Sequence, residues 1–81
     1  MKIPRDLNAK KLIRLLKKYD YFIDRQVGSH IRLSRSIRGS EHQITIPNHN
    51  PIKIGTLNSI LNDISEHLKL SKQDLVDKLF E

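Results

Sequence analysis

The chain has 81 residues, a length that fits one domain with a small hydrophobic core, and we expect residues 1–81 to fold as a single domain. Its formal net charge of +6 favours a polyanion or an acidic protein as partner, although many small proteins are basic without such a partner. The sequence contains no cysteine, which excludes disulfides and thiolate metal sites, and no apolar run is long enough to span a membrane.

The N-terminal segment is charged from its start and leads into a predicted helix. Met1-Lys2-Ile3-Pro4-Arg5-Asp6 lacks the apolar run of a secretion signal, so we expect a cytoplasmic protein. Asp6 is the predicted N-cap, because apolar residues follow it at helical spacing: Leu12, Ile13, Leu15, Leu16 and Tyr19. Cations occupy the rest of the helix surface, namely Lys10, Lys11, Arg14, Lys17 and Lys18. Such a cationic face is either simply solvated or follows an RNA backbone.

Three short strands joined by tight turns are predicted after this helix. The first covers residues 21–27, which are rich in aromatic and β-branched side chains, and Gly28-Ser29 forms the turn to a second strand over residues 30–36. Arg38-Gly39-Ser40 turns the chain again, and a third strand over residues 41–46 ends at a proline, which cannot donate to a sheet ladder. This pattern predicts an antiparallel meander with one buried face and one open face.

Two helices complete the predicted fold. A long helix begins between residues 54 and 56, with a buried stripe at Leu57, Ile60, Leu61, Ile64 and Leu68. Ser71 and Asp74 resemble a capping box that opens a short last helix, which docks either on the core or on a partner. Helices with one apolar stripe pack on the apolar face of a sheet. The order therefore predicts an α+β fold, α-β-β-β-α with a short C-terminal helix, in the layout of a double-stranded-RNA-binding domain.

The second predicted strand places a histidine where it can do chemistry. Successive side chains of a strand point to opposite faces, so Ile31 and Leu33 share one face while His30, Arg32 and Ser34 share the other. The polar face is expected to be open to water. An imidazole beside a guanidinium suits acid–base chemistry on a phosphate backbone, because the unperturbed pKa of histidine is about 6.5.

Three short motifs follow one another in a particular order along the chain. They are Arg25-Gln26-Val27-Gly28-Ser29-His30 before a strand, Ile44-Thr45-Ile46-Pro47-Asn48-His49 at the end of the next, and Ile54-Gly55-Thr56-Leu57 leading into Ile60-Leu61. Together, and at this chain length, they resemble the motifs of HicA-type toxins, the mRNA interferases of bacterial and archaeal toxin–antitoxin pairs. The order of predicted elements matches this family too, so the resemblance covers nearly the whole chain.

The resemblance implies a double-stranded-RNA-binding-like fold and an endoribonuclease that cleaves mRNA without the ribosome and arrests translation and growth. It implies that His30, in the Gly-Ser-His motif, is the residue on which toxicity depends. It also implies a HicB-type antitoxin, encoded next to the toxin, that covers the active face. The pair would repress its own operator DNA through the DNA-binding part of the antitoxin.

Cleavage through the RNA 2′-hydroxyl suits these residues without a metal ion or cofactor. His30 is the expected proton-transfer group, Arg32 is expected to bind a phosphate oxygen, and the backbone N–H groups of Gly28-Ser29 are expected to help. Two cations of the first helix are further candidates for phosphate contacts: Lys10 and Lys17. No recognised short spacing of metal ligands is present.

A second proton-transfer group is not obvious from the sequence, because this type of reaction uses both an acid and a base. The candidates are His42 at the start of the third strand, His49 in the loop after it, and Ser29. Two alternative functions also stay open. A non-catalytic double-stranded-RNA-binding-like module would bind RNA without cutting it, whereas a basic partner-docking protein would fail to bind RNA even at low salt.

Overall fold

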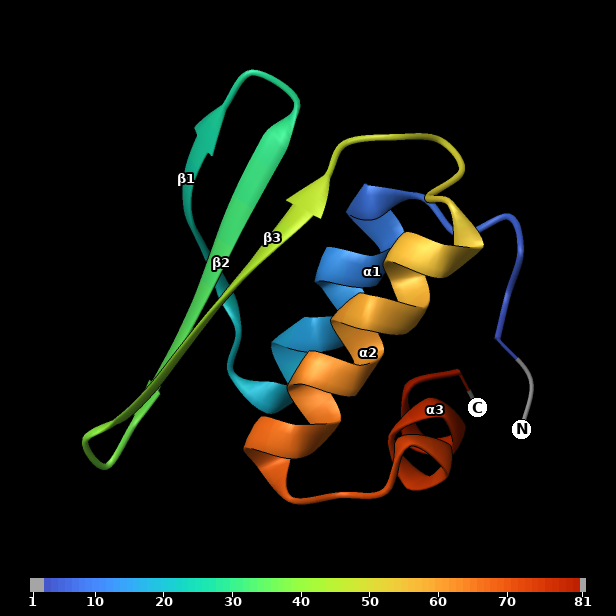
Figure 1. Ribbon diagram of the computed structural model, residues 1–81. Coiled ribbons are helices and arrows are strands. Elements are labelled where there is room, and N and C mark those ends of the chain that lie inside the picture. Colours follow the sequence, from blue (N-terminus) through green and yellow to red (C-terminus); the bar gives the residue numbers. More distant parts are fainter. Residues whose placement is uncertain (1–2, 81) are drawn as a thin grey trace.

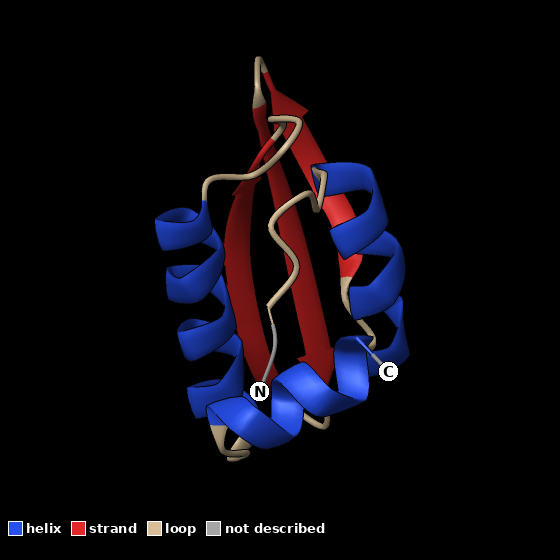
Figure 2. Cartoon of the chain, turned by 90° about the vertical axis from the view of Figure 1, so that its right-hand side faces the viewer, coloured by secondary structure: helices blue, strands red, loops and turns tan. Residues whose placement is uncertain are grey.

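The computed structural model describes residues 3–80. The protein consists of one three-stranded antiparallel sheet with helices on one of its faces (Figure 1). The elements are α1 (Ala9–Leu16), the 3₁₀ helix η1 (Lys17–Tyr19), β1 (Phe22–Val27), β2 (His30–Ile37), β3 (Ser40–Pro47), α2 (Ile54–Leu68) and α3 (Lys72–Phe80). Figure 2 shows the helices in front of the sheet, with the N-terminal segment running between α1 and α2. The predicted α+β fold, α-β-β-β-α with a short C-terminal helix, is confirmed.

Helix α1 begins later than the sequence predicts, and the N-cap is Asn8 instead of Asp6. The Asn8 Oδ1 accepts a hydrogen bond from the Lys11 backbone N–H at 2.8 Å. The Leu7 carbonyl accepts the Ile52 N–H at 2.8 Å, so the backbone just before Asn8 pairs with the loop that precedes α2. A tertiary hydrogen bond thus holds this backbone outside the helix, and the next polar residue caps the first turn.

The core lies between the sheet and the helices. On β2, Ile31 and Leu33 are 6% and 0% exposed, whereas His30 and Arg32 are exposed on the other face, so the predicted alternation is confirmed. Other side chains of the core come from all three helices and from β3: Leu12, Leu16, Ile44, Ile46, Leu57, Leu61, Ile64, Leu75, Val76 and Leu79. This packing leaves the whole face of the sheet opposite the helices open.

Helix α3 docks on this core, which answers one of the questions that the sequence left open. Leu75, Val76 and Leu79 are at most 1% exposed. The predicted cap is present, because the Ser71 Oγ accepts the Asp74 backbone N–H at 3.1 Å. The C-terminal helix is therefore part of the domain.

A two-residue turn joins β2 to β3 and makes both strands slightly longer than predicted. Arg38 and Gly39 have φ values of 51° and 80°, and positive φ at both central positions is the pattern of a type I′ hairpin turn. Pairing therefore extends to Ile37 and Ser40, which are Cα partners at the end of the ladder. Strand β1 begins at Phe22, one residue later than predicted.

We expect Arg38→Asn to stabilise the protein. The left-handed region costs an ordinary L-residue roughly 1–2 kcal/mol, and Asn adopts it more readily than Arg. The free energy of unfolding, measured by urea titration, should therefore rise by about 0.5–1 kcal/mol. Arg38→Val is the matched control and should lower it, because a β-branched side chain is strained at positive φ. An Asn variant no more stable than the wild type would contradict this account of the turn.

Candidate functional site

The hairpin between β1 and β2 determines where His30 points. Gly28 has φ 59°, which glycine adopts without strain at the first central position of a type II′ turn. This two-residue turn places Val27 opposite His30, and Arg25 opposite Arg32. His30 and Arg32 are exposed on the face of the sheet that the helices leave open. A short-range feature of the backbone therefore brings two guanidinium groups to the same face as the imidazole.

A hollow of about 370 Å³ lies on this open face around His30. It is lined by Arg25, Val27, His30, Arg32 and Thr45. Arg25, Arg32 and Thr45 are consecutive Cα partners across the three strands, which explains why they lie together. No carboxylate from the described residues lines the hollow, and the one ion pair within 4.0 Å found in residues 3–80 lies elsewhere. Two arginines without a carboxylate partner, beside an imidazole, can bind a phosphodiester through several of its oxygens.

Arg25 is a residue of this hollow that the sequence analysis did not assign to the site. A signal for it existed, because a two-residue turn pairs position 27 with 30 and position 25 with 32. Farther along β1 the same counting fails, since the register shifts between Ile23 and Arg25 and leaves Asp24 as the extra residue of a bulge. The Asp24 carboxylate accepts a hydrogen bond from Ser34 Oγ at 3.1 Å.

The loop after β3 is tied to the same end of the sheet. Asn48 donates its backbone N–H to the Ser29 carbonyl at 2.6 Å, and His30 is the Cα partner of Pro47. His49 is exposed and donates its backbone N–H to the Pro47 carbonyl at 2.9 Å. The structure thus places His49 in the segment that borders His30, and it stays a candidate for the second proton-transfer group.

Three of the predicted site residues lie away from the hollow. His42 is the Cα partner of Arg35 and bonds to a residue of α2, so it lies on the helix side of the sheet and not beside His30. The two-residue β2–β3 turn has this effect, because it determines which residues of the two strands share a face. Lys10 and Lys17 belong to α1 and η1 and line a different groove, which lies on the helix side of the sheet. The structure does not bring these three residues to His30.

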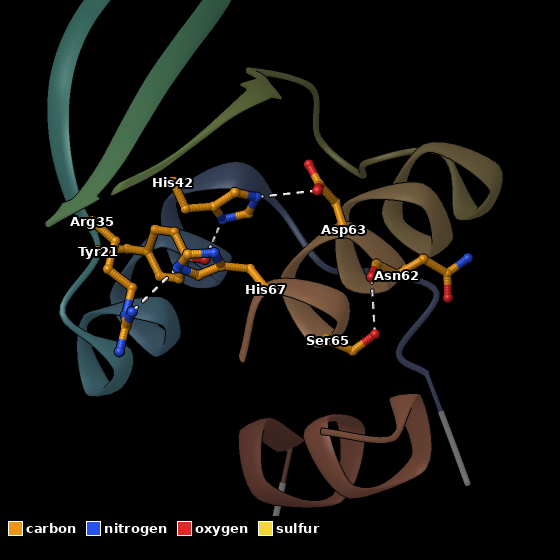
Figure 3. A network of polar contacts seen from close by, with 7 residues as sticks. All are labelled: Tyr21, Arg35, His42, Asn62, Asp63, Ser65 and His67. Carbon is orange, nitrogen blue, oxygen red and sulfur yellow. Dashed lines mark hydrogen bonds and ion pairs between the residues drawn. The ribbon is translucent and has the colours of Figure 1, made fainter. Parts of the chain in front are cut away.

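His42 instead belongs to a polar network between β3 and α2 (Figure 3). Its Nδ1 lies 2.6 Å from the Tyr21 hydroxyl, and its Nε2 lies 3.1 Å from Asp63 Oδ1. Its ring stacks on that of His67 with centroids 4.3 Å apart, and Arg35 Nη1 donates to His67 Nε2 at 3.3 Å. These two hydrogen bonds form together when Tyr21 donates to Nδ1 and the Nε2–H donates to Asp63.

Burial controls the protonation of two members of this network. Tyr21 is 2% exposed, and this burial raises its pKa to about 12 against the opposing effect of Arg35. Its hydroxyl therefore keeps its proton at neutral pH. Partial burial, together with the nearby His42 and Arg35, lowers the pKa of His67, although Asp63 acts in the opposite direction. The network joins the sheet to α2 and is a structural contact on the side away from the hollow.

We expect His67 to make the protein less stable in mild acid. Its pKa is lowered from 6.5 in the folded state, so the unfolded chain binds more protons below that pH and the free energy of unfolding falls as pH falls through and below about 6.5. Urea titrations across this pH range should show a smaller decrease for His67→Gln than for the wild type. Gln43→Ala is the control, because it removes an exposed side chain that does not titrate. An equal decrease in all three proteins would contradict the prediction.

Two other kinds of feature are absent from the part of the chain that the structure describes. No three of its His, Cys, Asp or Glu side chains gather closely enough to hold a metal ion. None of its helices has the length and apolar character that crossing a membrane requires.

The sequence matches one known protein family. The model of the family described as "HicA toxin of bacterial toxin-antitoxin" matches residues 9–65, which is more than half of the 81-residue chain. The matched region runs from the start of α1 into the last turn of α2 and contains the hairpin with His30. No curated protein and no solved structure matches the chain.

Proposed function

Because the chain belongs to the HicA family of toxins from bacterial toxin–antitoxin systems, we propose that it is a ribosome-independent endoribonuclease that cleaves mRNA and arrests translation and growth. One observation supports this most strongly: His30 shares a hollow on the open face of the sheet with Arg25 and Arg32. The imidazole can transfer a proton and the two guanidiniums can stabilise negative charge, and both tasks are part of cleavage through the 2′-hydroxyl of RNA.

The family implies an antitoxin as partner. We propose that this antitoxin is of the HicB type, that it neutralises the toxin in the cytoplasm, and that the toxin meets operator DNA only through it. The net charge of +6 supports this proposal, because basic surfaces bind nucleic acid without sequence preference and a bound antitoxin would keep this surface from RNA.

The proposed reaction uses the nucleophile that RNA itself carries. His30 removes the proton of the 2′-hydroxyl, the 2′-oxygen forms a bond to the adjacent phosphorus, and the bond from phosphorus to the 5′-oxygen breaks. Arg25 and Arg32 stabilise the negative charge that develops on the phosphorane oxygens. The products are a 2′,3′-cyclic phosphate and, once the leaving oxygen has gained a proton, a 5′-hydroxyl.

We propose His49 as the donor of the proton to the leaving oxygen. It follows Asn48, whose backbone hydrogen bond to Ser29 holds this loop against the turn that precedes His30. A base and an acid on the two sides of the scissile phosphate suit an in-line displacement, in which the attacking and leaving oxygens lie opposite each other. His30 would then act as base from β2, and His49 as acid from the loop.

The purified chain is expected to cleave single-stranded RNA in excess EDTA, because no step of this mechanism uses a metal ion. The measurement is gel analysis of end-labelled RNA, with mass spectrometry of the product ends to detect the 2′,3′-cyclic phosphate. An RNA of the same sequence with 2′-O-methyl groups throughout is the control and should stay intact. Loss of cleavage in EDTA with recovery in magnesium would rule out this mechanism, and RNA binding without cleavage would favour the non-catalytic module.

A further inference from the structure

Strand β1 differs from the other two strands because all of its residues are exposed. Four large apolar side chains are exposed in residues 3–80, and three of them lie on β1: Phe22 at 50%, Ile23 at 52% and Val27 at 60%. The strand is also an edge of the sheet, since it pairs with β2 alone. A free edge with exposed apolar side chains is a template for pairing with a strand of another chain.

A groove with a cationic rim adjoins this edge on the helix side of the sheet. Its volume is about 440 Å³, and it is lined mainly by Ile13, Ile23, Ile31, Lys10, Arg14 and Lys17. The three cations have no carboxylate within 4.0 Å in the described residues, because the one ion pair there joins His42 and Asp63. Ile23 belongs both to the exposed edge and to the groove, so the two features form one continuous surface, which we call the β1 edge surface.

We propose that the antitoxin holds this chain through an extended acidic segment that lies along the β1 edge surface. The segment adds a strand to β1, places an apolar side chain against Ile23 in the groove, and directs carboxylates toward the cations of α1 and η1. Arg25 and Val27, on the same strand, line the hollow around His30, so a segment on β1 reaches the border of that hollow. The proposal rests on the antitoxin that the family implies, and it holds whether or not the chain cleaves RNA.

An acidic and apolar peptide fits this surface better than the other two occupants. An RNA backbone would neutralise the cations but would leave Ile23 and Val27 in water, since phosphates offer no apolar contact. A second copy of the chain would bring together two molecules of net charge +6, with α1 cations beside both edges. Asp24 is the one acidic residue of β1, and its hydrogen bond to Ser34 holds it on the open face and away from the groove.

Binding of the purified antitoxin, obtained as the product of the gene next to that of this chain, tests the proposal by isothermal titration calorimetry. All variants carry His30→Ala, so that toxicity does not prevent expression and failure of the ribonuclease proposal does not affect the result. Ile23→Asp should weaken binding by about 30-fold or more, the effect of removing a central apolar anchor. Ile54→Asp is the matched control, because Ile54 is 46% exposed on α2, and it should bind like the parent.

Lys17→Glu is a second test variant in case Ile23→Asp fails to fold. It should weaken antitoxin binding and make that binding less dependent on salt.

Amide hydrogen exchange of the complex then tests the added strand: exchange in residues 22–27 should slow, while exchange in residues 40–47, on the opposite edge, should not change. Unchanged affinity of both variants, or protection of β3 instead of β1, would overturn the proposal. Two other results would also overturn it, because each assigns the surface to another occupant. The first is that the chain alone forms a dimer that Ile23→Asp dissociates. The second is that the two variants lose RNA affinity as strongly as they lose antitoxin affinity.

Discussion

His30→Ala is expected to lower the kcat/KM of RNA cleavage by about 10²- to 10⁴-fold, the range for removal of a general base. The protein should remain folded, because His30 is exposed and the neighbouring Ile31 and Leu33 hold β2 on the core. The measurement is single-turnover cleavage of end-labelled RNA, with the melting temperature determined on the same preparations. In cells that lack the antitoxin, the wild type should arrest growth and deplete mRNA, whereas His30→Ala should do neither.

Two other histidines serve as comparisons for this variant. His42→Ala should lower the melting temperature, since it removes the contacts to Tyr21 and Asp63, but it should leave cleavage by the folded protein unchanged. His49→Ala should lower cleavage, as expected for loss of the general acid. If His30→Ala cleaved RNA as fast as the wild type, the chemistry would belong to other residues. If the wild type and His30→Ala were equally toxic, RNA binding would be the cause of harm.

Arg25→Ala is expected to lower kcat/KM by about 10²-fold, although sequence analysis alone did not assign it to the site. Loss of one preorganised charge next to a developing negative charge costs about this much. Arg32→Ala should have a similar effect, because the two residues face each other across β1 and β2 in the same hollow. Arg25→Lys should recover only part of the activity, since an ammonium keeps the charge but not the planar fork.

Arg38→Asn is the control for charge alone. It removes one positive charge from the opposite end of β2, outside the hollow, and is expected to leave the fold intact. A general attraction of RNA to a basic protein would make Arg25→Ala and Arg38→Asn lose similar activity, and this loss would shrink as salt rises. A large loss with Arg25→Ala alone, still present at high salt, would show that its position matters more than its charge.

Local sequence features predicted most of the fold. Helical spacing of leucines located α1 and α2, alternation on β2 separated Ile31 and Leu33 from His30, and glycine turns located both hairpins. Each of these signals depends on backbone geometry within a few residues, so it can be read before any distant contact is known. The exposed position of His30 was predictable for the same reason.

Only the tertiary structure decided which residues from different elements lie together. The bulge at Asp24 and the hollow that adds Thr45 to Arg25 and Arg32 depend on the register of three strands. His42 was one of three candidates from the sequence for the second proton-transfer group, but pairing across the β2–β3 hairpin turns it toward α2, into contact with Asp63. Side-chain periodicity predicts which face of its own element a residue occupies, whereas packing and strand register determine what that face meets.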